Sequence, residues 1–459
     1  MEKTKVIIVG ASHGGHQSIL ELLSRYGENV DITLFEAGDY VSFMSCGMEL
    51  YLEDQVTSVN DVRNFRPENF PQPNVAILNN HEVNTINADK KTVTVTRKED
   101  GHTEEYAYDK LILSSGVKPN SLPVPGTDLE NVYLMRGYNW ATKIKERMTD
   151  PAVKKVAVIG SGYIGIEAAE VFLNAGKEVT LLDMIDRPLG TYLDKEMTDI
   201  LEAHLKEKGM NIKTSVNIKA FTGDGKVAAI ETDSGTIETD LIIQAAGVKP
   251  NTEWLKGIVD LDERGWIITD EYLQTNLPDV YAVGDATLAY SIPAGKKVPI
   301  ALATVARREA RYVVQHLFEQ TPSKPFGGLV GSSALRVFDY HFAASGLNSF
   351  TADRAGVAIK TAFYEDTIRP KFVPEEFGNG KAAVQLAYDP FTHQLLGGAV
   401  LSTKDITAQG NVLALAIQQK LTIEDLAEAD FFFQPGHDRQ WSLLNLAAQQ
   451  ALGEEPFVE

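Results

Sequence analysis

The chain has 459 residues, of which 44% are hydrophobic and 23% charged, a composition typical of a globular protein with about two or three buried cores. Because 63 acidic residues outweigh 43 basic ones, the formal charge of −20 repels nucleic acid and anionic membrane surfaces, and neither is an expected partner. No apolar run approaches the roughly 18 residues that span a bilayer, and a single cysteine without a secretion signal favours a cytoplasmic protein.

The chain begins with the pattern of a strand, a glycine turn and a helix. An apolar run at residues 6–9 leads into a turn that follows G-x-G-x-x-G, with serine in place of the middle glycine. The turn consists of Gly10, Ala11, Ser12, His13, Gly14 and Gly15. The next strand, residues 32–35, ends at Glu36, about 20 residues past the turn, where a carboxylate can accept from a ribose 2′-hydroxyl. These features predict a dinucleotide site; the alternative is an ordinary tight turn.

Cys46 is the only cysteine, so the chain cannot close an intramolecular disulfide. Residues 48–52 indicate a short helix, which places Cys46 in or near the first turn, with Ser42 and Ser45 able to cap it. The free backbone N–H groups and the dipole at a helix start stabilise a thiolate, and we therefore expect a lowered thiol pKa. The alternative is a buried cysteine that serves as a small hydrophobic residue.

A second strand, turn and helix begin near residue 156. Strand 156–159 is followed by a complete G-x-G-x-x-G motif. Its glycines are Gly160, Gly162 and Gly165, with Tyr163 and Ile164 between the last two. The next strand, residues 179–182, ends at Asp183. A carboxylate there accepts from a free 2′-hydroxyl and repels a 2′-phosphate, which favours NAD over NADP.

Three further apolar strands are predicted at residues 111–113, 241–244 and 280–283, and each ends in small residues. Those residues are Ser114, Ser115 and Gly116 after the first strand, Gly247 after the second, and Gly284 and Asp285 after the third. After the third strand and its loop, a helix is expected to begin at Ala301, Leu302 and Ala303. The pattern predicts an α/β protein with two interleaved Rossmann-like domains. The first comprises residues 1–120 and 250–325, and the second residues 121–249.

Residues 326–459 carry no glycine motif, and we expect them to form an α+β domain that provides an oligomer interface. Antiparallel strands are predicted at 382–388 and 394–400, and helices at 413–420 and 423–429. Three consecutive aromatics, Phe431 to Phe433, favour an interface, because they would otherwise be exposed; the alternative is a buried strand within the domain.

These residues resemble the flavin-dependent NADH peroxidases and water-forming NADH oxidases, a branch of the pyridine-nucleotide disulfide reductases with a single redox cysteine. The resemblance covers nearly the whole chain and rests on residues 12–15, 42–48, 160–165, 284–285 and 430–435. Bacterial NADH peroxidases look most similar. The features that favour them are His13 before two glycines, Ser45 before Cys46, residues 133–137, residues 338–340, and Arg307.

The resemblance implies FAD in the first domain and NADH in the second, with Cys46 cycling between thiolate and sulfenic acid as hydrogen peroxide is reduced to water. It implies catalytic roles for Cys46, His13 and Arg307. The implied FAD residues are Gly10, Ala11, Ser12, His13, Gly14, Gly15, Glu36, Cys46, Ser114, Ser115, Gly116, Arg136, Asp285, Ala301, Leu302 and Ala303. The implied NAD residues are Gly160, Gly162, Tyr163, Ile164, Gly165, Glu167, Asp183, Tyr192 and Gly247, with Tyr192 as a lid.

Several alternatives stay open at this point. His13, at the start of a helix, is expected to act as a neutral hydrogen-bond partner, or merely to touch the cofactor, and Arg307 could lie on a solvated helix face. The histidine spacing suggests no metal site. A water-forming NADH oxidase, a coenzyme A disulfide reductase and an electron carrier for a partner protein are the alternative functions, and a homodimer or homotetramer is the expected assembly.

Overall fold

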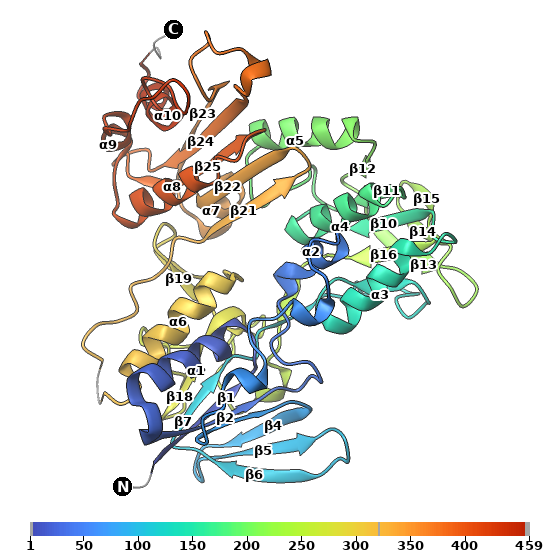
Figure 1. Ribbon diagram of the computed structural model, residues 1–459, viewed down its shortest axis with the longest axis vertical. Helices are drawn as coiled ribbons and strands as arrows, with labels where there is room; N and C mark the ends of the chain where they lie inside the picture. The colour runs from blue at the N-terminus through green and yellow to red at the C-terminus, as the bar shows by residue number, and fades with distance from the viewer. Residues whose placement is uncertain (1–2, 320–321, 455–459) are drawn as a thin grey trace.

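Two parallel sheets of five strands each form the frame of the molecule (Figure 1). The computed structural model describes residues 3–319 and 322–454. In order across the first sheet, the strands are β18 (Val280–Ala282), β7 (Lys110–Leu113), β1 (Thr4–Val9), β2 (Val30–Phe35) and β3 (Val75–Leu78). In the second sheet they are β12 (Asn211–Lys213), β11 (Glu178–Leu182), β10 (Lys155–Ile159), β16 (Leu241–Gln244) and β9 (Val132–Leu134). The predicted α/β fold and the seven strands predicted for these sheets are confirmed.

The parallel register brings the ends of the central strands to one edge of each sheet. Val9 at the end of β1 pairs with Phe35 of β2 and Leu113 of β7. In the second sheet, Ile159 pairs with Leu182 and Gln244. The glycine turn, the acidic residue and the small-residue turn that follow these strands therefore lie side by side in each sheet, as the sequence predicts.

Within the described ranges, six α-helices accompany the two sheets. They are α1 (His13–Tyr26), α2 (Met48–Leu52), α3 (Tyr138–Thr149), α4 (Tyr163–Asn174), α5 (Lys195–Glu207) and α6 (Ala303–His316). Helices α1 and α6 pack together beside the first sheet (Figure 1). Helix α2 follows Cys46, but it lies against α3 and α4 of the second sheet, and its Met48 and Leu52 belong to the same apolar cluster as Ile144 of α3.

Smaller antiparallel elements flank the main sheets. One three-stranded sheet consists of β4 (His81–Asn87), β5 (Thr92–Arg97) and β6 (Thr103–Ala107), and another of β13 (Ile218–Thr222), β14 (Ala229–Thr232) and β15 (Gly235–Glu238). Two strand pairs are formed by β8 (Val117–Pro119) with β17 (Val248–Pro250) and by β19 (Ala289–Ser291) with β20 (Lys296–Val298). The β8–β17 pair brings together the two segments by which the chain leaves and re-enters the first sheet. The domain boundaries drawn from the sequence stay a prediction.

The C-terminal part is built on a five-stranded antiparallel sheet. Its strands, in spatial order, are β21 (Ser332–Val337), β22 (Tyr340–Gly346), β25 (Leu395–Ser402), β24 (Lys381–Tyr388) and β23 (Lys360–Thr367); its helices are α7 (Ser349–Ala355), α8 (Ala408–Gln418), α9 (Ile423–Ala427) and α10 (Leu443–Ala451). The two predicted strands are confirmed as β24 and β25, and the two predicted helices as α8 and α9, with shifted ends.

The aromatic run near the C-terminus lies in no strand, so the alternative of a buried strand is wrong. Phe431 packs against the C-terminal core, whereas Phe432 is 71% exposed and Phe433 46%. Hydrogen bonds of the neighbouring loop, such as Asp438 N–H to Gln434 O, replace a strand ladder. The interface assigned to these residues stays a prediction.

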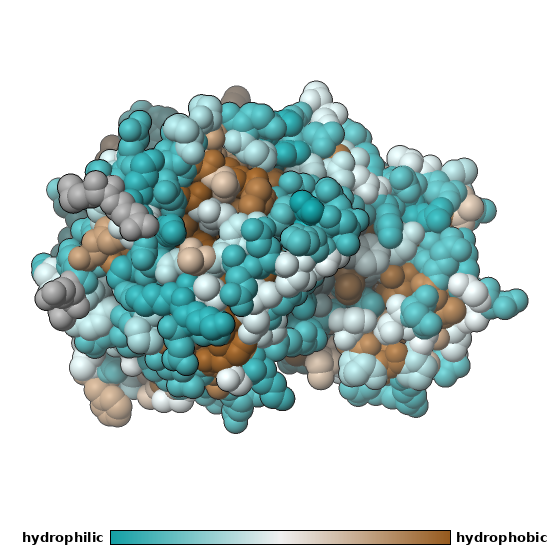
Figure 2. Space-filling view, turned by 90° about the horizontal axis from the view of Figure 1, so that it is seen from below, coloured by the Kyte–Doolittle hydropathy of each residue, from teal (hydrophilic) through white to brown (hydrophobic). Residues whose placement is uncertain are grey.

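The surface seen from below is mostly hydrophilic, and a furrow separates the larger part of the molecule from a smaller lobe (Figure 2). Among the described residues, no helix combines the length and the apolar character that crossing a membrane requires.

Gly15→Ala is expected to lower the melting temperature by several degrees, because the added Cβ would overlap the carbonyl oxygen of Gly10 in the rigid turn. Thermal unfolding followed by circular dichroism tests this. Gly327→Ala is the matched control, since its Cβ would meet nothing within 4 Å. Equal melting temperatures for the two variants would contradict the prediction.

Candidate functional site

The first glycine turn closes so tightly that two of its positions exclude any side chain. Gly10 has φ +101°, and a Cβ there would overlap the carbonyl oxygen of Ser114. A Cβ at Gly15 would overlap Gly10, and one at Gly14 would lie 2.5 Å from Ser114 Oγ. Ser12 is the N-cap of α1 and tolerates its side chain, although it makes no side-chain capping bond. Close packing of strand, turn and helix leaves the backbone of the turn open for a ligand's phosphates.

Polar groups without protein partners surround this turn. Ser115 Oγ and His13 Nδ1 are buried and have no hydrogen-bond partner among the described residues. Glu36, at the end of β2, accepts from the N–H groups of Ala11 at 3.1 Å and Gly38 at 2.8 Å. Burial raises the pKa of Glu36, while these N–H groups act in the opposite direction. The first sheet therefore offers a polar cradle, which suits a polar ligand such as a nucleotide.

Cys46 lies in a 3₁₀ turn, Ser45–Gly47, directly before α2, as expected for a position near the first turn of the helix. The expected side-chain caps are absent, because neither Ser42 nor Ser45 bonds to this helix start. Solvent reaches the Cys46 side chain, yet protein surrounds it on most sides.

The predicted lowering of the thiol pKa is wrong. Burial is the largest cause and raises the pKa of Cys46, and the charge of ionised Glu167 raises it further; a backbone hydrogen bond in the turn, Arg136 and Arg307 lower it without offsetting the rise. A short helix supplies few aligned peptide groups, so the loss of hydration outweighs the helix start. The side chain is nevertheless open to solvent, so the alternative of a buried hydrophobic cysteine does not hold either.

His13 is a neutral imidazole in this site. Burial and the positive charges of Arg307 and Arg136 lower the pKa of His13 to about 4. The same two guanidinium groups act on the Cys46 thiol. The structure therefore gathers His13, Cys46, Arg136 and Arg307, and it gives His13 the neutral state expected from the sequence.

Arg307 projects from α6 into a cradle that sequence reasoning missed. Its guanidinium donates to Gln17 Oε1 at 3.1 Å and Asn64 Oδ1 at 2.9 Å, and contacts His16 Nδ1 at 3.2 Å. Burial and Arg307 together lower the pKa of His16 to about 4. His16 and Gln17 lie one helical turn after His13 on α1, so their spacing could have placed them on the same face as His13. Nothing in the sequence indicated that Asn64 would also contact Arg307. The cradle fixes Arg307, so it is not simply solvated.

Asp285 and Arg136 lie together, with Asp285 Oδ2 and Arg136 Nη2 3.6 Å apart. Beneath them, the Gly284 N–H donates to Glu309 Oε2 at 2.7 Å. Burial is the main cause that raises the pKa of Glu309 to about 8. Glu309 thus supports the Gly284–Ala286 turn as a neutral acid at pH 7. The sequence signal for it was only its place on the buried face of α6. Ala301 precedes α6, Leu302 is its N-cap and Ala303 its first residue.

The second glycine turn repeats the tight packing of the first. A Cβ at Gly160 would overlap the Ala245 carbonyl oxygen, and one at Gly165 would overlap Gly160. Asp183 Oδ2 accepts from the N–H and the hydroxyl of Ser161, both at 2.6 Å, and Asp183 Oδ1 from the Ile185 N–H at 3.1 Å. The carboxylate is therefore held beside the turn, where a ribose diol would meet it.

Aromatic and acidic side chains flank the second turn. The rings of Tyr163 and Tyr192 stack with centroids 4.0 Å apart, and Tyr192 lies next to Gly162. Burial raises the pKa of Glu167 to about 8, with further contributions from nearby glutamates. Ile164 starts the helix behind the turn, and Gly247 follows β16 with φ +81°. Gly116 likewise follows β7, with φ +64°.

The arrangement combines two nucleotide-type turns with one solvent-accessible thiol beside two cations and a neutral imidazole. A lone thiol can give up two electrons by becoming a sulfenic acid, and the cations can stabilise an anion next to it. Within residues 3–319 and 322–454, no group of three or more His, Cys, Asp or Glu side chains is arranged to hold a metal ion.

Comparison with known proteins identifies relatives along the whole chain. A family model described as pyridine nucleotide-disulphide oxidoreductase matches residues 4–310. The NADH oxidase of Enterococcus faecalis is 40% identical over 450 residues, which cover 98% of this chain and 99% of that protein. The water-forming NADH oxidase from Lactobacillus brevis, bound to NADH, is 34% identical with a TM-score of 0.93, and the match covers 98% of each chain. The NAD(P)H coenzyme A polysulfide/persulfide reductase of Pyrococcus horikoshii is 30% identical over 97% of this chain and 98% of its own.

Glu309→Gln is expected to remove a pH dependence of folding stability. The pKa of Glu309 rises from its ordinary value of 4.5 to about 8 on folding, so its contribution is complete below pH 4.5 and is lost as the pH rises to 8. The wild-type free energy of unfolding should fall relative to that of the variant by up to about 4 kcal/mol across this window. Denaturant unfolding at pH 5 and pH 8.5 tests it; parallel pH profiles would contradict it.

Proposed function

The chain belongs to the pyridine nucleotide-disulphide oxidoreductase family, and on this premise we propose that it is a FAD-dependent NADH oxidase that reduces oxygen to water. The observation that carries the proposal is the solvent-accessible Cys46 beside Arg136 and Arg307, with Glu167 of α4 near the same thiol. The names of the relatives favour oxygen as the oxidant.

The residues of the first sheet fit FAD. The close-packed Gly10 and Gly15 leave the turn backbone accessible to a pyrophosphate, and Glu36 suits a ribose. Ser115 Oγ and His13 Nδ1 provide unpartnered polar atoms next to the turn. The bound flavin would supply transfer of two electrons from NADH to an acceptor. In the second sheet, the turn from Gly160 to Gly165 and the carboxylate of Asp183 would hold NADH.

In the second half of the reaction, Cys46 would reduce the peroxide that forms from oxygen. The thiolate sulfur attacks one peroxide oxygen; the S–O bond forms, the O–O bond breaks, and hydroxide leaves with the electron pair of that bond. Arg136 and Arg307 stabilise the thiolate and the leaving anion. His13, neutral at pH 7, would hydrogen-bond to the departing oxygen, while the proton that completes water comes from solvent.

The sequence patterns ranked NADH peroxidase first, and that reading stays a prediction. Both reactions use the same Cys46 step, and they differ in whether peroxide enters from solvent or is made at the site. The persulfide reductase relative keeps coenzyme A disulfide chemistry as a further candidate, which also needs a single thiol. We further propose a cytoplasmic homodimer or homotetramer, supported by the exposed Phe432 and Phe433.

Cys46→Ser is expected to change the stoichiometry and leave oxygen uptake intact. The wild-type protein should consume two NADH per oxygen without releasing peroxide, whereas the variant should consume one NADH per oxygen and release hydrogen peroxide, because nothing reduces the peroxide further. An oxygen electrode combined with NADH absorbance and a peroxide assay measures all three quantities. Fast turnover with added peroxide and little with oxygen would instead identify a peroxidase.

Asp183→Asn is expected to raise the KM for NADH about tenfold, because a charged hydrogen bond contributes roughly 1.5–3 kcal/mol. The KM for NADPH should fall as repulsion of the 2′-phosphate is lost. Initial rates with both nucleotides test the prediction. Asp199→Asn is the control, since Asp199 lies on α5 and pairs only with Lys195 in the described structure. Unchanged discrimination between the nucleotides would contradict the assignment.

A further inference from the structure

Helix α2 is a five-residue element whose own sequence cannot hold it in place. It begins two residues after Cys46, so its position determines where the thiol lies. Helices this short are unstable without tertiary contacts. Glu49 and Glu53 are spaced i,i+4 and therefore share one face of α2, where two like charges repel each other.

Arg336 from the C-terminal sheet neutralises that acidic face. Its Nη2 lies 2.7 Å from Glu53 Oε2, 3.4 Å from Glu49 Oε1 and 3.9 Å from Glu170 Oε1. The three glutamate side chains are largely buried, with 11%, 15% and 3% exposure. Burial and the neighbouring Glu53 and Glu49 raise the pKa of Glu170 to about 7, although Arg336 opposes the shift. One guanidinium from β21 thus joins α2 of the first domain to α4 of the second.

Lys145 from α3 binds the C-terminal end of α2. Its Nζ donates to the Leu52 carbonyl oxygen at 2.6 Å and lies 2.8 Å from Asp54 Oδ1. A cation at a helix C-terminus satisfies carbonyl groups that have no partner within the helix.

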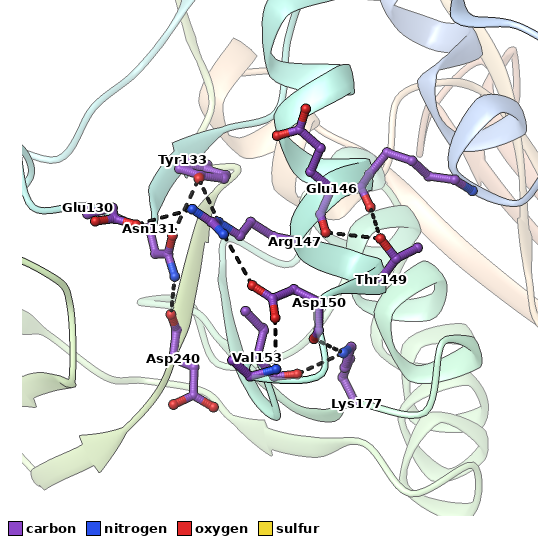
Figure 3. Close-up of polar contacts among 12 residues, drawn as sticks. Glu130, Asn131, Tyr133, Glu146, Arg147, Thr149, Asp150, Val153, Lys177 and Asp240 are labelled. Atoms are coloured by element: carbon purple, nitrogen blue, oxygen red, sulfur yellow. Dashed lines mark hydrogen bonds and ion pairs between the residues drawn. The ribbon is translucent and has the colours of Figure 1, made fainter.

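Helix α3 is itself fixed to the second domain. Near its end, Arg147 pairs with Glu130 at 3.1 Å and Asp150 at 3.2 Å and donates to the Tyr133 hydroxyl at 3.3 Å (Figure 3). Lys177 donates to the carbonyl oxygens of Asp150 and Val153 in the same network. Lys145 therefore projects from a rigid support, and a shift of α2 relative to α3 would break its bonds.

We propose that Arg336 and Lys145 are positioning residues for Cys46: two cations, one from each of the other two domains, clamp the helix that follows the thiol. The inference rests on the proposed function only in taking Cys46 as the redox thiol. The apolar contacts of Met48 and Leu52 in the cluster that also contains Ile144 and Val337 define the same three-domain junction. The docking of the domains thereby sets the position and the charge environment of the thiol.

The first experiment measures peroxide released per NADH oxidised by the holoenzyme in air. Arg336→Met and Lys145→Met are each expected to raise this ratio about threefold or more over the wild type, since perturbing a coupling element changes local equilibria by this order. The KM for NADH should stay within about twofold. Arg336→Lys should restore most of the wild-type ratio, because it keeps the charge. Lys208→Met is the matched control: Lys208 pairs with Asp339 of the adjacent β21–β22 turn and, in the part of the chain that the structure describes, makes no hydrogen bond or ion pair with α2.

A second measurement does not depend on the oxidant. Alkylation of Cys46 by iodoacetamide at pH 7, in holoenzyme reduced with NADH without oxygen, should be about threefold slower in Arg336→Met, because the acidic face loses its cation. If Arg336→Met does not fold, Arg336→Lys and Lys145→Met still test the clamp. The inference would be overturned if every folded variant released as much peroxide per NADH as the wild type and if its Cys46 were alkylated at the wild-type rate. If Cys46→Ser releases no peroxide while Arg336→Met reacts slowly with iodoacetamide, the proposed function fails and the clamp stands.

Discussion

The parallel register of the two five-stranded sheets is the constraint on which the site depends. Because Val9 pairs with Phe35 and Leu113, the segments that follow three separate strands emerge at one edge of the first sheet. A slip of one residue would move Glu36 and Ser114 away from Gly10 and turn the strand's apolar side chains to the wrong face. The second sheet repeats the arrangement, so each nucleotide turn is built by backbone pairing and needs few special side chains.

Acidic side chains that are largely shielded from solvent lie at the Asp285 turn and around Cys46. Glu309 supports the Gly284–Ala286 turn that holds Asp285, Glu167 lies near Cys46, and Glu170 lies beside Arg336. Burial raises the pKa of each to about 7 or 8. A carboxyl group that is partly protonated at neutral pH accepts burial at lower cost than a carboxylate, which explains how so acidic a junction is compatible with folding.

The glycine turns, their strands and the acidic residues after them were predictable because they follow from local spacing. The neutral state of His13 was expected from its place at a helix start, although burial and the distant Arg307 and Arg136 are what lower its pKa in the structure. The pKa of Cys46 was not, because burial and Glu167, from a helix more than a hundred residues away, outweigh the local helix start. Asn64 and Arg336 were likewise invisible, since their importance comes only from contacts between distant segments.

The same electrostatics make the reactivity of Cys46 a property of the assembled protein. Burial and Glu167 oppose the thiolate, and the cations that favour it come from different parts of the chain: Arg136 follows β9 of the second sheet, and Arg307 lies on α6 beside the first. Even together, the two cations leave the pKa of the Cys46 thiol raised by burial and by Glu167. The environment of the thiol is therefore set where both sheets are docked, because the groups that raise and the groups that lower its pKa come from both of them.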